Sequence, residues 1–470
     1  MNKRVVVPTA VIATAAAAVA AVAAKRAWED PVTKARAERW WRVGRLTTVR
    51  SGTFVITKVR GTAVNEERRR HLDEQFAIRT AEDVTAELGH MKGALMKIGQ
   101  LVSFIVEGLP DNVQETLASL QSDVPPMAPS LAESVIREDL GEGPDRLFLS
   151  WDPLPVAAAS IGQVHKAVLR DGREVAVKVQ YPGLAATLES DLSDAKRLHR
   201  VFSMVTLKSL DMATMVDELR DRMHEELDYE LEASRQQRFH DRYEGHPFLA
   251  VPAVVPEFSS ARVLTSEWVD GMDWATFEAT ADEPLRQKVG EGLFRWEQGA
   301  IYRAREFNAD PHPGNYRFHP DGSITLLDFG LAKRWTQAEV DSLWPLIDPL
   351  LAGDAEGAVE QMVRAGFLAA DHGLDPQHVW EYVSTPYQPF LVEEFQFSRE
   401  FTKDALGRIA DISGPYSDVI NSLTLPPSFI LLDRVVWGIA AILGRLGAKN
   451  QWRGILAEYR EDATPVTDLG

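Results

Sequence analysis

The stretch Asp310-Pro-His-Pro-Gly-Asn315, followed by Ile324-Thr-Leu-Leu-Asp328-Phe-Gly330, decides what this chain folds into. It places three oxygen-bearing side chains, those of Asp310, Asn315 and Asp328, in two loops beside an apolar run. Mg²⁺ takes such hard oxygen ligands from separate loops, because the ion keeps several waters and shares its shell with phosphates. Either motif alone could be an acidic surface turn, but the ordered pair predicts a metal-and-phosphate site.

The spacing within the two motifs is similar to that of protein kinases. Asp310 and Asn315 have the separation found in the kinase catalytic loop H-R-D-x-x-x-x-N, and Asp328 opens a D-F-G motif. In kinases the loop Asp orients or deprotonates the accepting hydroxyl, while the Asn and the second Asp hold Mg²⁺. We therefore expect Asp310 to be catalytic, and Asn315 and Asp328 to be metal ligands.

A lysine upstream fits the same chemistry. Val175-Ala-Val-Lys178 resembles the kinase V-A-I-K strand, whose Lys neutralises the α- and β-phosphates. It falls in the second of two strand-like runs, 163–169 and 174–180, and the turn Arg170-Asp-Gly172 between them predicts a β-hairpin.

The loop before this hairpin is rich in alanine where a kinase would have glycine. Glycine lets backbone N–H groups approach a phosphate with no Cβ in the way, so methyl groups at 157–159 would alter or narrow that approach. The candidate nucleotide contacts here are Ala157, Ala158, Ala159, Ser160 and Gly162.

The order of the remaining patterns predicts the fold class. A helix is expected over 131–140, and strands around 250–255 and 262–269. After Gly271 the pattern is helical, apart from the loop-and-strand region 306–330. A strand-rich part followed by a helix-rich part predicts an α+β, bilobal, protein-kinase-like fold.

An ion-pair partner for Lys178 is expected on the helices that follow it. The acidic run 225–232 offers several carboxylates, and spacing alone does not choose among them, since each could face solvent. The candidates are Glu226, Asp228, Glu230 and Glu232.

Composition limits the classes of function. The chain contains no cysteine, which excludes disulfides, thiolate metal sites and cysteine nucleophiles. Residues 1–64 carry twelve Lys and Arg against three acidic residues, a net of +9 within a chain of net −18. The acidic remainder argues against general nucleic-acid binding, and the basic arm favours an anionic membrane surface.

The N-terminal run 5–24 is uncharged and long enough to span a bilayer as a helix, with a cleaved signal peptide as the alternative. More positive charge follows it than precedes it, which places the body on the cytoplasmic side. A second apolar stretch, 429–443, contains Asp433 and Arg434 and is expected to be a buried core helix.

Further motifs resemble the UbiB/AarF atypical kinase family, the relatives of the mitochondrial coenzyme-Q kinases. The resemblance covers most of 85–460. It rests on Met96-Lys97-Ile-Gly-Gln100, similar to the family's K-x-G-Q helix, on Leu120-Gln-Ser-Asp-Val-Pro-Pro126, on the Ala-rich loop, on Val177-Lys178-Val-Gln-Tyr-Pro-Gly183, on Glu226-Leu-Asp228, and on the two motifs quoted first.

The resemblance implies roles for individual residues. Lys178 would contact phosphates with Glu232 as its ion-pair partner. Lys97 and Gln100 would come from a helix that folds over the active site, with Lys97 meeting the carboxylates of Glu226 and Asp228.

The resemblance also assigns the adenine contact. Glu267-Trp-Val269 would be the hinge that bonds adenine through its backbone. The chain departs from the family at Asn308, where a His is usual, and that position is expected to be structural. His165 and His312 are also expected to be structural.

These patterns predict a membrane-associated atypical kinase or ATPase that binds ATP or ADP with Mg²⁺. The resemblance implies a role in isoprenoid-quinone or lipid metabolism, so the expected partners are membrane lipids and the proteins or small lipid-like substrates of that metabolism. The alternatives are a small-molecule or protein phosphotransferase, and a nucleotide-gated, lipid-binding scaffold with negligible turnover. Protein phosphorylation is disfavoured because the K-x-G-Q extension would occupy the space of a docked peptide.

The expected organisation has six parts. They are an apolar anchor or signal-like segment (1–24), a basic juxtamembrane segment (25–64), a helical K-x-G-Q extension (65–130), a kinase-like N-lobe (131–269), a kinase-like C-lobe (270–462) and a tail (463–470).

Overall fold

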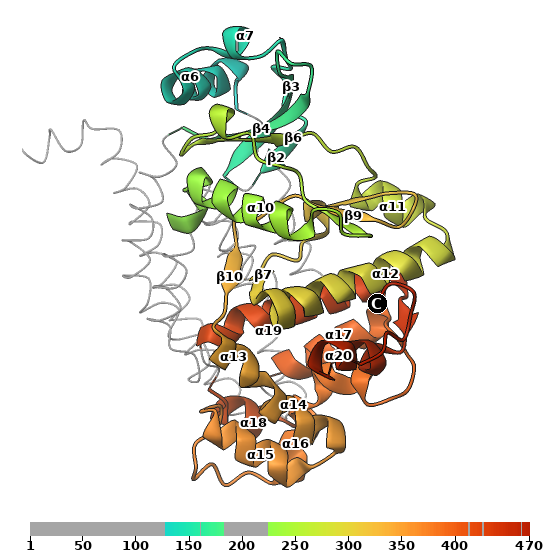
Figure 1. Ribbon diagram of the computed structural model, residues 1–470. Helices are drawn as coiled ribbons and strands as arrows, with labels where there is room; N and C mark the ends of the chain where they lie inside the picture. The colour runs from blue at the N-terminus through green and yellow to red at the C-terminus, as the bar shows by residue number, and fades with distance from the viewer. Residues whose placement is uncertain (1–126, 160, 183–223, 412–413, 425–426, 462) are drawn as a thin grey trace, which may run out of the picture. The chain divides into compact units, whose positions relative to one another are not determined.

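The computed structural model describes residues 127–159, 161–182, 224–411, 414–424, 427–461 and 463–470 (Figure 1). The chain divides into two compact units, Met1–Met91 and Lys92–Gly470, and every described residue belongs to the second. The predictions for the anchor, the juxtamembrane segment, Lys97, Gln100 and Ser160 therefore lie outside the described residues.

The strand-rich part is a five-stranded antiparallel sheet. Its order is β1-β3-β4-β6, and β2 pairs with β3. Lys178 lies on β4, between two partner strands. The β3–β4 connection is the predicted hairpin, and Gly172 takes the left-handed conformation (φ 92°) that explains a glycine there. The strands are β1 (Ser150–Trp151), β2 (Ala157–Ala159), β3 (Gly162–Val168), β4 (Glu174–Gln180) and β6 (Val263–Glu267).

Two short helices, α6 (Pro129–Leu140) and α7 (Pro144–Leu147), accompany this sheet. The predicted helix over 131–140 is confirmed and begins two residues earlier, at a proline, whose fixed φ suits the first turn of a helix. Apolar side chains of α6 and alternate residues of β4 share one core. Its members include Ala132, Val135, Ile136, Val175, Val177 and Val179.

Helix α10 (Tyr229–Tyr243) follows, and the side chain of Asp228 caps its N-terminus by accepting a hydrogen bond from Leu231 N (3.0 Å). The strand predicted over 250–255 is much shorter, since only β5 (Leu249–Ala250) forms, with an isolated bridge between Val254 and Ser266. Pro252 explains the interruption, because proline has no N–H to give to a neighbouring strand.

Two further small sheets hold the two polar motifs (Figure 1). Strand β7 (Glu306–Asn308) pairs with β10 (Ala332–Arg334), and β8 (Tyr316–Phe318) pairs with β9 (Ile324–Leu326), which in turn pairs with β5. The loop 310–315 connects β7 to β8, and the loop 328–330 connects β9 to β10. The strand pairing thus fixes both motifs side by side.

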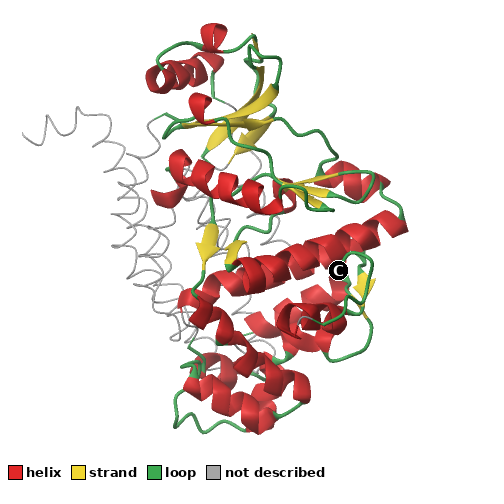
Figure 2. Ribbon diagram, viewed as in Figure 1, coloured by secondary structure: helices red, strands yellow, loops and turns green. Residues whose placement is uncertain are grey.

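Most of the described residues after β10 are helical, as Figure 2 shows. Helices α12 and α19 pack against each other within the largest hydrophobic core. The elements are the 3₁₀ turns η1 (Pro256–Phe258), η3 (Pro313–Asn315) and η4 (Thr385–Phe390), the π-helix η2 (Gly299–Ala304), and the helices α11 (Trp274–Thr280), α12 (Glu283–Gln298), α13 (Gln337–Asp341), α14 (Leu343–Ala352), α15 (Ala355–Arg364), α16 (Pro376–Val383), α17 (Arg399–Ala410), α18 (Ser417–Ser422), α19 (Pro427–Leu446) and α20 (Trp452–Glu461), with the strand pair β11 (Phe395–Gln396) and β12 (Lys449–Asn450).

The apolar stretch 429–443 lies within α19 and is a core helix, as predicted. Val435, Trp437, Ile439 and Leu443 are almost fully buried in the main core. Within the described part of the chain, no helix is both long and apolar enough to cross a membrane. The predicted succession of a strand-rich part and a helix-rich part is confirmed.

Candidate active site

The centre of the site is an ion pair between strand β4 and helix α10. Lys178 Nζ donates to both carboxylate oxygens of Glu232, at 2.7 and 2.9 Å, and lies 3.8 Å from Oδ2 of Asp328. Of the four carboxylates that the sequence offered as partners, the structure brings Glu232 to Lys178. The Lys178 side chain is 15% exposed and that of Glu232 only 3%, so the pair is largely removed from water.

Charge and burial act against each other in this pair. Burial would lower the pKa of Lys178, but the charges of Glu232 and Asp328 hold that pKa well above its ordinary value of 10.5. Burial raises the pKa of Glu232, and the Lys178 charge opposes that rise. Because the two N–O contacts are short and charge-assisted, we take the pair as ionised near neutral pH.

The Ala-rich segment forms a tight hairpin with β3. Ala157 and Ala158 are exposed, Ala159 is half-buried, and the pairing of Ala159 with Gly162 closes the β2–β3 turn. A Cβ at Gly162 would overlap the carbonyl oxygen of Val179 and stand 2.9 Å from the Tyr229 hydroxyl. The single glycine of the loop therefore serves the close approach of β3 to β4.

The loop that begins at Asp310 is held by short polar contacts. Asn315 donates from Nδ2 to the Asp310 carbonyl oxygen (2.9 Å) and to its Oδ2 (3.3 Å). Asn308, 3% exposed, accepts from the Asp310 N–H (2.9 Å) and donates to the Asp328 carbonyl oxygen (2.6 Å). Asn308 thus joins the two motif loops, which is the structural role expected for this position.

Helix α19 supports the same loop from the helix-rich part. Arg434 Nη2 donates to Asp310 Oδ1 at 2.6 Å, and both side chains are mostly buried. One turn further on, a Cβ at Gly438 would overlap the ring of Pro311. Sequence reasoning missed Arg434 as a site residue. Its signal was a charged pair inside an apolar run, which had served only to exclude a membrane span.

The donor set suits Mg²⁺ bound together with a phosphate compound. Since the Asn315 amide donates through Nδ2, its Oδ1 is left as an acceptor, and Asp328 adds a carboxylate that is one-third exposed. Asp328 Oδ1 also accepts the Gly330 N–H (2.9 Å), which fixes its rotamer. No cluster of three or more His, Cys, Asp or Glu suited to a metal occurs among the described residues. Mg²⁺ with phosphates and waters needs only one or two carboxylates from the protein.

The segment expected to contact adenine ends strand β6. Glu267 pairs with Val175, and its N–H donates to Ala253 O (3.0 Å). Trp268 N donates to Glu174 O (3.0 Å), whereas no hydrogen bond to a described residue engages the Val269 backbone. Val269 can therefore offer its N–H to a ligand.

The remaining predicted residues have structural surroundings. Glu226 is 6% exposed and lies near Gly330, while Asp228 is exposed and caps α10. His165 is fully buried and bonds to Gln163 Nε2 (2.8 Å), and His312 Nδ1 accepts the Gly314 N–H (3.0 Å). His165 Nδ1 also bonds to the Asp152 carbonyl oxygen (2.9 Å), and its ring stacks on Trp151. Both histidines thus support the local backbone and packing, in agreement with the structural role expected of them.

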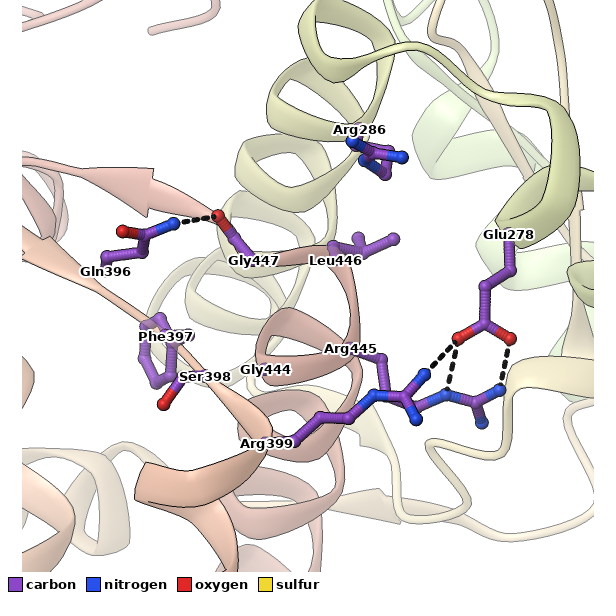
Figure 3. Close-up of a pocket in the computed structure, with 10 residues that line it drawn as sticks. All are labelled: Glu278, Arg286, Gln396, Phe397, Ser398, Arg399, Gly444, Arg445, Leu446 and Gly447. Carbon is purple, nitrogen blue, oxygen red and sulfur yellow. Dashed lines mark hydrogen bonds and ion pairs between the residues drawn. The ribbon is translucent and has the colours of Figure 1, made fainter.

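An open cavity of about 430 Å³ lies elsewhere, between α11, α17 and the end of α19 (Figure 3). Glu278 projects into it and is bound by Arg445 (2.6 and 3.0 Å) and Arg399 (2.9 Å). None of its lining residues belongs to the two motifs or to the β4–α10 pair, so it is distinct from the candidate nucleotide site.

The fold and the site define a kinase-like domain of an atypical kind, with a lysine–glutamate pair, an Asp–Asn loop, a D-F-G motif and an alanine-rich β2–β3 hairpin. The chain belongs to the ABC1 atypical kinase-like domain family, whose model matches residues 119–362. The fold class and the family resemblance drawn from the motifs are confirmed.

Relatives of this chain occur in yeast, plants and bacteria. It is 29% identical over 377 residues to the mitochondrial atypical kinase COQ8 of Saccharomyces cerevisiae, covering 78% of this chain and 73% of that protein. It is 30% identical to the chloroplastic ACTIVITY OF BC1 COMPLEX KINASE 1 of Arabidopsis thaliana, covering 65% of this chain but only 45% of the plant protein. The solved structure of Rv3197 with erythromycin, from Mycobacterium tuberculosis, is 30% identical, with a TM-score of 0.61 over 83% of this chain and 97% of that one.

Proposed function

We propose that this chain binds ATP or ADP with Mg²⁺ and transfers or hydrolyses the terminal phosphoryl group. One observation carries the proposal: Lys178, which is paired with Glu232, lies with its Nζ 3.8 Å from Oδ2 of Asp328. A cation beside a metal-binding carboxylate is what a polyphosphate requires.

In this proposal each residue has one task. Lys178 would neutralise the α- and β-phosphates, Asn315 and Asp328 would hold Mg²⁺, and Asp310 would orient the attacking hydroxyl or water. Mg²⁺ held by Asn315 and Asp328 would supply positive charge that offsets the negative charge developing on the phosphoryl group. Positioning and charge neutralisation supply most of phosphoryl-transfer catalysis, so no covalent intermediate on the protein is needed.

The Arg434–Asp310 pair supports a second candidate, nucleotide binding that gates a lipid-directed scaffold with little turnover. A guanidinium at 2.6 Å holds one carboxylate oxygen of Asp310 in a charge-assisted hydrogen bond. In that case Asp310 would orient a group without deprotonating it.

We also propose that the protein acts at a membrane, on quinone-type or other lipid metabolism, as the family resemblance suggests. Its clients would be lipids, lipid-like phenols or the proteins that handle them. The apolar run 5–24 and the basic arm after it support this proposal by composition. A topology reporter fused to the C-terminus should give its signal on the cytoplasmic side, and a signal outside would contradict that orientation.

The test uses the full chain in detergent or liposomes. ADP release from Mg-ATP is measured with neutral liposomes, with anionic liposomes, and with an added quinone-precursor phenol. Asp328→Asn should abolish turnover, whereas Asp321→Asn, an exposed aspartate of the β8–β9 turn, should leave it unchanged. Turnover that persists in Asp328→Asn would refute the metal site, and nucleotide binding without turnover in every condition would favour the scaffold.

A further inference from the structure

Helix α10 presents a row of polar contacts along one face. Glu232 meets Lys178, Arg235 Nη1 donates to Gly330 O (2.7 Å), and Arg238 Nη2 donates to Glu306 Oε1 (2.6 Å). Residues three apart lie on the same side of a helix, so one helix face touches strand β4, the D-F-G loop and strand β7. The far end of this row lies outside the site already described.

Glu306 is the anchor at that far end. Its side chain is 2% exposed, and Arg242 and Arg334 also approach it, at 3.6 and 3.4 Å from Oε2. Burial would raise the pKa of Glu306, but the hydrogen bond from Arg238 and the surrounding guanidinium charges lower it below its ordinary value. One buried carboxylate thus holds two arginines of α10 and one of the segment after Asp328.

A strained backbone position directly precedes Glu306. Arg305, the residue directly after the π-helix η2, takes a left-handed conformation (φ 54°, ψ 26°). Any residue with a Cβ is strained there, and such strain gathers where a particular geometry is required. Glu306 lies directly opposite Arg334 in the β7–β10 pair. It stands two residues before Asn308, and therefore on the same side of β7.

We propose that Glu306 is a positioning residue: a resident carboxylate that locks α10, and with it Glu232, onto the strand that leads into the catalytic loop. Regulated protein kinases obtain a comparable lock by phosphorylating the segment after D-F-G, whose phosphate then pairs with arginines. Here the anion is built into β7. The nucleotide site is therefore assembled without covalent modification of that segment.

This inference deepens the proposed function and rests on it for its effect on nucleotide binding. A helix released at Glu306 spends part of its time with Glu232 away from Lys178. The apparent nucleotide affinity is then the intrinsic affinity multiplied by the fraction of molecules that keep the competent arrangement. The greater mobility of α10 in the variant does not depend on nucleotide and can be measured in its absence.

The experiment compares the full chain with Glu306→Gln and a matched control, Glu278→Gln. Glu278 is likewise a carboxylate held by two arginines, but it lies on α11 at the separate cavity. Hydrogen exchange is followed over 229–243 without nucleotide, and Mg-ADP affinity is measured by calorimetry. Glu306→Gln should speed exchange in α10 at least about tenfold and weaken Mg-ADP binding about tenfold. Glu278→Gln should change neither.

Two further arms keep the proposal open to refutation. If Glu306→Gln fails to fold, Arg238→Gln, whose side chain is 38% exposed, gives the milder test with the same expected direction. In a Glu232→Gln background, Glu306→Gln should weaken Mg-ADP binding no further, because it acts through Glu232. Four outcomes would each overturn the proposal. Two concern the variants alone: unchanged hydrogen exchange in α10, or an equal effect of Glu278→Gln. The other two are additive effects of Glu306→Gln and Glu232→Gln on Mg-ADP binding, and loss of Mg-ADP binding after phosphatase treatment. Failure of the wild-type protein to bind Mg-ADP would refute the proposed function alone, since the exchange arm needs no nucleotide.

Discussion

Arg434 of helix α19 donates to Asp310 of the loop 310–315 across 2.6 Å, although 124 positions separate them in the sequence. Close to this pair, Pro311 of the same loop packs against Gly438 of α19. The helix-rich core therefore holds both the backbone of this loop, at Pro311, and the side chain of Asp310.

Arg434→Gln should lower turnover by a factor of about 100 while Mg-ADP binding stays within about threefold, because Asp310 acts on the attacking group and not on the nucleotide. Removing one partner of a mostly buried pair should also cost about 3 kcal/mol of unfolding free energy. Single-turnover kinetics and urea unfolding measure the two effects. Arg445→Gln on the same helix is the control and should leave turnover unchanged, since Arg445 binds the distant Glu278. Equal turnover in wild type and Arg434→Gln would show that the pair has no part in the reaction.

Lys178→Met should lower the free energy of unfolding by about 3 to 5 kcal/mol near pH 8, because it leaves Glu232 buried without its partner. Burial raises the pKa of Glu232, so its ionised form destabilises the folded variant as pH rises through that pKa. The loss should therefore grow between about pH 5 and pH 8.

In the wild-type protein, the free energy of unfolding should also fall at alkaline pH. The pKa of Lys178 is raised in the folded state, so its contribution to stability is complete below the ordinary 10.5 and is lost as pH rises through the folded pKa. Urea unfolding across this range tests both pH dependences. The double variant Lys178→Met/Glu232→Gln should recover part of the stability at pH 8. A stability difference independent of pH would contradict the buried ion pair.

The residues that we propose for the metal and the phosphates could be picked out from the sequence because their signal is local. Asp310, Asn315, Asp328 and Lys178 sit in short motifs whose spacing survives without knowledge of the fold. The contacts of Arg434 and Glu306 could not be predicted, because they join residues far apart in the sequence and no periodic pattern encodes them.

The misjudged strand has a different cause. The run 250–255 has strand-like composition, but Pro252 removes a donor and the chain forms only two residues of β5. The Lys178 partner is an intermediate case. Spacing left four carboxylates open, and only the family resemblance singled out Glu232.

Gly162→Ala should lower the free energy of unfolding by about 1 to 3 kcal/mol and weaken nucleotide binding, because the added methyl overlaps Val179 O and crowds the Tyr229 hydroxyl. The neighbouring hairpin supplies the comparison. Gly172→Ala meets no atom within 4 Å but must adopt φ 92°, so it should cost only about 1 kcal/mol and leave nucleotide affinity unchanged. Thermal unfolding and Mg-ADP calorimetry distinguish the two. If both variants lost the same Mg-ADP affinity, the packing of the β2–β3 hairpin on β4 would not shape the proposed phosphate-binding part of the site.

Asn308→Asp keeps the acceptor for the Asp310 N–H but removes the donor to the Asp328 carbonyl oxygen. It also places a second carboxylate between the two loops. A buried carbonyl left without its donor costs about 1 to 3 kcal/mol, and a displaced Asp328 should weaken Mg²⁺-dependent nucleotide binding about tenfold. The control is Asn421→Asp on α18, where the amide donates to Ser417 O (2.6 Å) at an exposed position far from the motifs. Nucleotide titration with and without Mg²⁺ gives the decisive comparison. The loss in Asn308→Asp should be confined to the Mg²⁺ series, because Asn308 acts through the metal-binding loop, and an equal loss without Mg²⁺ would show that it shapes the nucleotide pocket by another route.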